Sequence, residues 1–238
     1  MKILERLREE KEMRLKGGLY HKTQVAITYN SNHIEGSTLS EEQTRMIFEE
    51  DKILSDGAFV EINDIIETKN HFKCFDYVIE NAEKPLSEDF IKTLHKILKT
   101  GTSDANKNWF KVGEYKSRPN EVGGFATTAP NQVAEKIQAL LNQYNSKKQI
   151  NFEDIIKFHK NFEDIHPFQD GNGRVGRLIM FKECLKNGIT PFIIQEKNKF
   201  YYYRGLREWQ NEKGYLIETC RFEQDIYQSW VDYFFPPH

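Results

Sequence analysis

Apolar residues recur at helical spacing along most of this chain, whereas the alternation that marks half-buried strands is scarce. Residues 85–98 show the pattern clearly. After a proline stop and Ser87 as a cap, apolar side chains fall at i, i+1, i+4, i+7 and i+8 from Phe90. A chain of 238 residues is long enough to bury a full core. The periodicity therefore predicts an all-α fold.

Similar patterns place the other helices. The longest is expected over residues 59–82, with Phe59 and Ile62 on its apolar stripe. Further helices are predicted over 1–16, 22–34, from a capping box at Ser40 and Gln43, over 133–144, from a cap at Asn151 to residue 162, over 178–185 and twice in the last fifty residues.

Residues 100–130 lack helical period and are rich in glycine, proline and polar side chains. A loop of this length inside a compact domain is commonly functional. Its tip, which contains Gly123 and Gly124, is expected to form a hairpin or flap.

The composition excludes several classes of protein. With a net charge of −2, the chain has no global basic field, so no nucleic-acid contact is predicted. Cys74, Cys184 and Cys220 stand far apart, which disfavours a disulfide framework and a zinc site. The charged N-terminus lacks the apolar core of a signal peptide, and no run approaches membrane-spanning length. We expect a cytoplasmic protein with no membrane contact.

Residues 166–177 concentrate groups that suit a nucleotide phosphate. Pro167 keeps His166 out of the right-handed helical region, so its imidazole should project from a helix end as the one neutral-pH base. A glycine-rich turn lets backbone N–H groups converge on an anion at the N-terminus of a helix expected to start near Arg174. Asp170 has the character of a magnesium ligand. The groups assigned to the phosphate cradle are Gly171, Asn172, Gly173, Arg174, Gly176 and Arg177.

Each of these features also has a structural explanation, as a helix corner, a turn or a solvated face. Their density within one short stretch favours a functional site. Neither a P-loop nor a dinucleotide-binding fingerprint fits, because the lysine and the preceding strand that those motifs need are missing. Together the groups indicate attack of a hydroxyl on a nucleotide phosphate.

The same stretch resembles the signature of the Fic (Fido-fold) family, H-x-F-x-D/E-G-N-G-R-x-x-R, at every defined position. The resemblance implies a helical bundle with a short β-hairpin flap beside the active site, with residues 86–226 as the catalytic core. It also implies transfer of AMP from ATP to a Ser, Thr or Tyr hydroxyl of a target protein, with His166 as the base. Asp170 would hold Mg²⁺ on the phosphates. The phosphates themselves would be bound by Gly171 to Gly173, Arg174 and Arg177.

Other parts of the site follow from the same resemblance. Tyr202 and Tyr203 are similar to the family's nucleotide-binding tyrosines, and Gln210 replaces the usual Asn or Asp near the adenine. Glycine at position 173, where related phosphorylating toxins have lysine, favours AMP transfer. The flap that aligns the target chain would comprise Glu121, Val122, Gly123, Gly124 and Phe125.

A second motif lies upstream. Ser31, Glu35 and Gly36 are similar to the family's inhibitory pattern [S/T]-x-x-x-E-[G/N], in which Glu35 would pair with Arg177 and exclude the γ-phosphate. The alternative is an ordinary helix end within residues 31–36. By the same resemblance, residues 1–85 are expected to form an N-terminal region that carries the motif, and residues 227–238 a tail packed on the core.

The leading hypothesis is a self-inhibited, Mg-ATP-dependent protein adenylyltransferase that can also modify itself. Two alternatives remain at this point: a de-AMPylase in which Glu35 orients water, and an ATP-sensing module without turnover. The target protein is unidentified, and the N-terminal helices leave room for a homo-oligomer contact.

Overall fold

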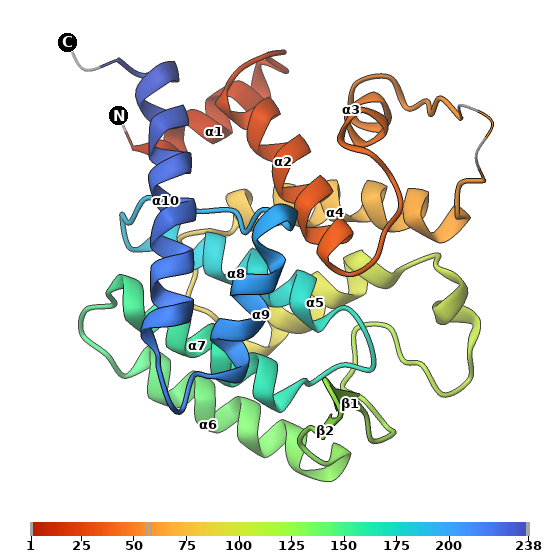
Figure 1. Ribbon diagram of the computed structural model, residues 1–238, viewed down its shortest axis with the longest axis vertical. Coiled ribbons are helices and arrows are strands. Elements are labelled where there is room, and N and C mark those ends of the chain that lie inside the picture. Colours follow the sequence, from red (N-terminus) through yellow and green to blue (C-terminus); the bar gives the residue numbers. More distant parts are fainter. Residues whose placement is uncertain (1, 56, 58, 237–238) are drawn as a thin grey trace.

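The computed structural model describes residues 2–55, 57 and 59–236. Helices dominate this part of the chain, as Figure 1 shows, and confirm the predicted all-α class with one small hairpin. The helices are α1 (Ile3–Glu12), α2 (Leu19–Ile34), α3 (Glu41–Glu50), α4 (Ile62–Glu80), α5 (Glu88–Lys99), α6 (Val133–Asn145), α7 (Phe152–Ile165), α8 (Asn172–Lys186), α9 (Lys199–Arg207) and α10 (Gly214–Phe234).

Helix starts form where the sequence offers a side-chain acceptor. Ser87 accepts the backbone N–H of Phe90 at the start of α5, and Asn151 accepts that of Asp154 at the start of α7. At α3 the predicted capping box is complete: Ser40 and Gln43 each bond the other's backbone N–H. These caps satisfy N–H groups that have no partner within the helix.

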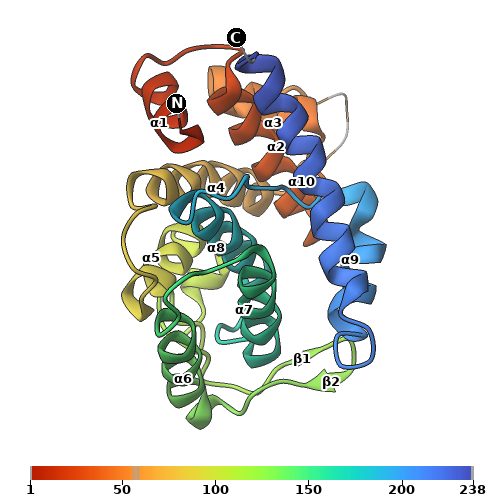
Figure 2. The same cartoon turned by 90° about the vertical axis from the view of Figure 1, so that its left-hand side faces the viewer.

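Helix α8 lies at the centre of the fold. All its residues from Asn172 to Leu185 are buried, including the segment 178–185, which is apolar nearly all round and was expected in the core. It contacts α2, α4, α5 and α7, and the main hydrophobic core around it runs from Leu7 in α1 to Tyr227 in α10. The first helices and the central ones therefore share one core. Figure 2 shows α10 along one side of the molecule, beside α9.

The structure corrects the boundaries of two predicted segments. The long helix begins at Ile62, and Phe59 and Ile62 are 102% and 72% exposed, so neither belongs to the core stripe. The predicted boundary between core and tail, at residue 226, falls inside α10. Tyr227 is buried there, so the residues that follow continue a packed helix.

The loop before α6 contains the expected hairpin. Strands β1 (Glu121–Val122) and β2 (Phe125–Ala126) pair antiparallel, with Glu121 opposite Ala126 and Val122 opposite Phe125. Gly123 and Gly124 at the tip both have positive φ, which glycine adopts without steric cost. Short 3₁₀ turns flank this region at Ser103–Asn106 and Pro130–Gln132, and another, Glu196–Asn198, precedes α9.

Among the described residues, no helix combines the length and the apolar character that crossing a membrane requires.

Candidate active site

The site is built on the corner between α7 and α8. His166 ends α7 with φ 50° and ψ 63°, so the residue before Pro167 leaves the right-handed helix as predicted. Beyond it, Phe168 is fully buried and stacks on the imidazole of His95 at 4.0 Å. The corner is therefore anchored in the core while the His166 side chain stays partly exposed.

Asn172 closes the loop that leads into α8. Its side-chain oxygen accepts the N–H of Phe168 at 2.8 Å, and its amide donates to the Phe168 carbonyl at 2.9 Å. Asn172 is 1% exposed. Its side chain therefore shapes the loop instead of pointing at a phosphate, and it also begins α8 two residues before the expected start at Arg174.

The N-terminal turn of α8 receives a carboxylate from α2. A Cβ on Gly173 would lie 2.2 Å from Oε1 of Glu35, so only glycine leaves room for this side chain. The helix N-terminus attracts negative charge through its free N–H groups and its dipole. The carboxylate of Glu35 therefore lies over the N-terminal turn of α8, next to Gly173.

Arg177 holds that carboxylate. Its Nη2 contacts Oε1 of Glu35 at 2.7 Å and donates to the Ser31 carbonyl at 2.9 Å, while Nε donates to Ser31 Oγ at 3.0 Å. Although burial opposes it, Glu35 holds the pKa of Arg177 above its usual value. Gly36 has φ 102°, which lets the chain turn away directly after the pair. The predicted contact between the motif at 31–36 and Arg177 is therefore present.

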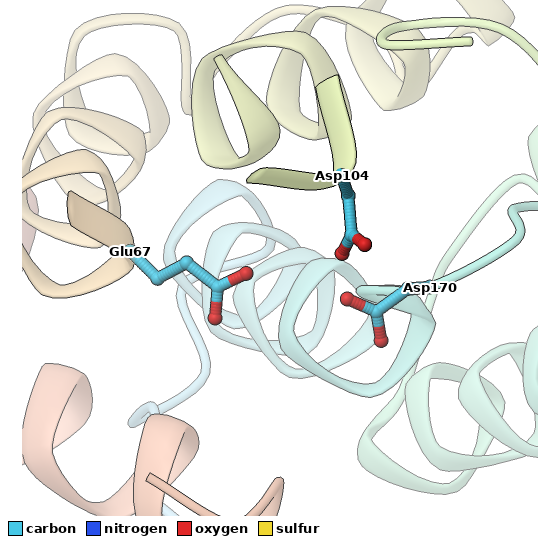
Figure 3. A group of neighbouring side chains, drawn as sticks. All are labelled: Glu67, Asp104 and Asp170. Carbon is cyan, nitrogen blue, oxygen red and sulfur yellow. The ribbon is translucent and has the colours of Figure 1, made fainter. Parts of the chain in front are cut away.

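Asp170 lies in a cluster of charges. Lys99, 1% exposed, donates to Asp170 at 2.6 Å, Glu67 at 2.5 Å and Asp104 at 2.9 Å. Figure 3 shows these three carboxylates facing one another, from α4, the loop after α5 and the corner. Burial acts to raise the pKa of Asp170, but Arg174 and Lys99 hold it well below the usual range.

The donor set fits a magnesium ion. Magnesium prefers carboxylate oxygens together with phosphate oxygens. Lys99 and Arg174 both contact Oδ2 of Asp170, and 47% of that side chain is exposed, so the carboxylate has an open side. Lys99 pairs with all three carboxylates and so offsets part of the negative charge of the cluster.

Arg174 was predicted from the sequence to contact phosphate, and the alternative was an arginine on a solvated face. It is 4% exposed and forms ion pairs with Glu67 and Asp170. Sequence reasoning missed Glu67 and Lys99. Lys99 lies four residues after His95 and eight after Ile91, on the buried face of α5, and a charge on that face was the available signal.

The loop that leads into the hairpin is fixed to the corner between α7 and α8. Lys116 donates its backbone N–H to the Pro167 carbonyl at 2.9 Å, and its ammonium group donates to Asn120 at 2.7 Å. Asn120 in turn donates to the Phe168 carbonyl at 3.0 Å. Val122 and Phe125 beyond them are 48% and 71% exposed. The predicted flap residues therefore project from the corner and leave their edges accessible.

The tyrosines of α9 that were predicted to contact the nucleotide lie in different environments. Tyr202 is 1% exposed, with its hydroxyl 2.7 Å from Nε2 of His159, so its side chain belongs to the core and not to a nucleotide pocket. Tyr203 is 43% exposed and donates to the Ile34 carbonyl at 3.2 Å, next to Glu35. Gln210 is exposed in the turn after α9. Tyr203 and Gln210 remain predictions as adenine contacts.

Gly176 also differs from its predicted role. It faces the interior, where an added Cβ would lie 2.7 Å from Oε1 of Glu163 and 2.8 Å from His159. Its lack of a side chain makes room for these groups, not for phosphate. Sequence reasoning gave no role to Glu163, although its spacing of four from His159 and three from His166 places it beside both.

Comparisons with known proteins agree with this geometry. Residues 85–184 match the Fic/DOC family. Protein adenylyltransferase Fic of Aedes aegypti is 29% identical over 207 residues, which are 86% of this chain and 40% of that protein. Protein adenylyltransferase fic-1 of Caenorhabditis elegans is 26% identical over 192 residues, 79% of this chain and 37% of that protein. The chain thus spans two fifths or less of the length of these curated relatives.

Solved structures share the fold. A Fic-domain-containing signaling protein from Bacteroides thetaiotaomicron superposes with a TM-score of 0.76 at 24% identity, over 96% of this chain and 94% of that one. Fic-1 from C. elegans, residues 134–508, gives a TM-score of 0.75 at 20% identity, over 97% and 70%.

Proposed function

Because this chain carries a Fic/DOC-family domain, we propose that it is a protein adenylyltransferase, which moves AMP from ATP to a hydroxyl of a target protein. The observation that carries the proposal is the placement of His166 beside the α8 N-terminus, with Arg177 and Asp170 flanking the same turn. A base, an anion site and a carboxylate are what transfer of a nucleotidyl group needs.

The proposed reaction is a single in-line displacement. The target hydroxyl oxygen attacks the α-phosphorus of ATP, and its proton passes to the imidazole of His166. The bond from the α-phosphorus to the bridging oxygen breaks, and pyrophosphate leaves with the electron pair. Positioning and charge stabilisation supply most of the rate, as in phosphoryl transfer.

The chain's own residues divide the work. N–H groups at the start of α8 would bind phosphate oxygens, aided by the positive φ of Gly171. Arg177, freed from Glu35, would contact the terminal phosphates. Asp170 would hold magnesium, which neutralises phosphate charge when bound. The exposed edge of β1 and β2 would align a segment of the target by strand-like pairing.

Glu35 is proposed to inhibit this reaction. Its carboxylate occupies the anion site and pairs with Arg177, so it competes with the γ-phosphate for the same cation. The competitor belongs to the same chain, which makes its effective concentration high. Substrate hydroxyls on the chain itself would be modified once the carboxylate leaves.

The test supplies ATP labelled at the α- or the γ-phosphate to the wild type and to Glu35→Gly, with protein-bound label as the measurement. We expect label only from the α position. Removal of a charge-assisted contact worth about 1.5–3 kcal/mol should raise transfer by roughly tenfold to a hundredfold. Label from the γ-phosphate alone would reject AMP transfer.

Two further variants control this experiment. Glu61→Gly removes an exposed glutamate that also stands at a helix end but makes no capping hydrogen bond, so transfer should stay at the wild-type level. His166→Ala, combined with Glu35→Gly, should lower transfer by about 10²–10⁴-fold, the usual loss when a general base is removed. Undiminished transfer in that double variant would exclude His166 as the base.

A further inference from the structure

A largely buried carboxyl group lies between two imidazoles directly beneath the proposed base. Glu163 on α7 is 14% exposed, and its Oε2 lies 3.9 Å from Nδ1 of His166. Its Oε1 lies 4.0 Å from Nδ1 of His159. Among the described residues, Glu163 Oε1 and both Nδ1 atoms are buried without a hydrogen-bond partner. Buried polar atoms in that state are rare and call for an explanation.

The neighbouring helix provides space for this carboxyl group. An added Cβ on Gly176 of α8 would approach Glu163 Oε1 to 2.7 Å and His159 Nδ1 to 2.8 Å. Any side chain at position 176 would therefore displace the group. On its other side His159 is hydrogen-bonded through Nε2 to the Tyr202 hydroxyl at 2.7 Å.

His166 lacks the partner that a catalytic histidine usually has. Burial, and then the nearby Lys116, lower the pKa of His166 to about 4, which makes it a poor proton acceptor in this state. The backbone of Glu163 acts to raise that pKa, but no acceptor meets hydrogen-bond geometry at Nδ1. A carboxylate on Nδ1–H would orient the ring with Nε2 outward and stabilise the imidazolium that forms.

We propose that Glu163 is a positioning residue for His166. When Glu35 leaves the site, the Glu163 carboxylate accepts a hydrogen bond from Nδ1–H of His166 and so makes Nε2 of that ring a stronger base. The inference rests on the proposed adenylyl transfer. The required approach is about 1 Å, and catalytic hydrogen bonds are often long before substrate binds.

The charges around Glu163 connect it to the inhibitory contact. Burial, and then the charge of Glu35 on α2, raise the pKa of Glu163 to about 8, against the opposing effect of Arg177 on α8. The other titratable neighbours are Lys160, Asp164 and His159 on α7, and Tyr202 and Tyr203 on α9. The neutral carboxyl form is therefore favoured while Glu35 is present. Departure of Glu35 favours the carboxylate, the form that accepts from His166.

The experiment measures the pKa of His166 by NMR on ¹⁵N-histidine-labelled protein, without nucleotide. It compares Glu35→Gly with Glu35→Gly/Glu163→Gln, which removes the charge but keeps the shape. We expect the pKa of His166 to fall by about one unit or more in the double variant, because an opposite charge at this distance favours the charged imidazole. The same pKa in both proteins would overturn the proposal.

Two additional variants separate the role of the carboxylate from general effects. Asp164→Asn, in the same Glu35→Gly background, removes the adjacent carboxylate that pairs with Lys160 and should leave the His166 titration unchanged. Glu163→Asp keeps the carboxylate charge but moves it away from His166. The pKa of His166 in this variant should therefore lie between its values with Glu and with Gln at position 163. This variant also serves if Glu163→Gln does not fold.

Transfer kinetics give an independent readout. Glu163→Gln should lower kcat by roughly tenfold or more, with KM for ATP within about twofold, and should move the acid limb of kcat to lower pH. A merely structural role would lower stability without moving that limb. If the His166 pKa shifts but no variant ever transfers AMP, the interaction between Glu163 and His166 is supported and the proposed function is rejected. If transfer occurs and the His166 pKa does not shift, only the proposed role of Glu163 is rejected.

Discussion

At the scale of single residues, the site is defined by two glycines and by the two acidic side chains that occupy the space next to them. Gly173 leaves space for Glu35 over the start of α8, and Gly176, three residues later, leaves space for Glu163 on the inner side. Gly173 and Gly176 thus serve two different purposes: Gly173 accommodates the carboxylate that pairs with Arg177, and Gly176 accommodates a carboxyl group in the interior.

Gly173→Ala tests the position of Glu35. The added Cβ should overlap Oε1 of Glu35, and the overpacking should lower the free energy of unfolding by about 1–3 kcal/mol. In the Glu35→Gly background the cost should be at least about 0.5 kcal/mol smaller, since the two positions are coupled. Denaturant unfolding of the four proteins measures this. Equal costs in both backgrounds would mean that Glu35 does not occupy this place in solution.

At the scale of elements, α7 determines where the imidazole of His166, the proposed base, lies. It starts at the Asn151 cap and ends at His166, so a shift of either end would move the imidazole. The cap is reciprocal: Asn151 accepts the Asp154 N–H at 2.9 Å, and Asp154 accepts the Asn151 N–H at 3.2 Å. This arrangement was predictable from the sequence because both partners lie within one helical turn.

Asn151→Ala should destabilise the protein by about 1 kcal/mol, with a fall of roughly 2–4 °C in Tm, because the Asp154 N–H at the start of α7 loses its side-chain acceptor. Gln132→Ala is the matched control. Gln132 precedes α6 without a side-chain capping bond and is exposed, so its replacement should change stability by less than about 0.5 kcal/mol. Calorimetry measures the Tm of both variants, and indistinguishable Tm values would contradict the role of the Asn151 cap.

At the scale of the whole molecule, the N-terminal helices and the family-matched region share a core. Phe75 on α4 is fully buried and packs edge-on against Phe181 on α8, with ring centres 5.2 Å apart. Phe181 in turn packs edge-on against Tyr227 on α10. Residues from the beginning, middle and end of the chain therefore support one another. The helix that carries Glu35 is held by the same core that holds α8.

Phe75→Ala should lower the free energy of unfolding by about 3–5 kcal/mol through loss of burial and the cavity left behind. The identical change at Phe59, which is 102% exposed, should cost less than about 0.5 kcal/mol. Chemical denaturation followed by fluorescence and by circular dichroism should show one coincident transition for each protein. Two separated transitions in Phe75→Ala would show that the N-terminal helices unfold on their own.

The sequence by itself determined the local features of this protein. Caps at Ser40, Ser87 and Asn151, the corner at His166 and the glycine-rich start of α8 follow from interactions within a few residues, which sequence spacing reports directly. The pairing of Glu35 with Arg177 was anticipated only through resemblance to a family, because the two motifs lie far apart in the chain.

Only the tertiary structure decided which charged groups meet. Lys99 joins Glu67 and Asp170 across 32 and 71 residues of chain, and Glu163 reaches Gly176 only because α7 packs on α8. Tyr202 and Tyr203 are adjacent in sequence, yet one lies in the core and the other at the surface. Which face of a helix is buried, and against what, depends on packing between distant segments, and that information is not contained in local spacing.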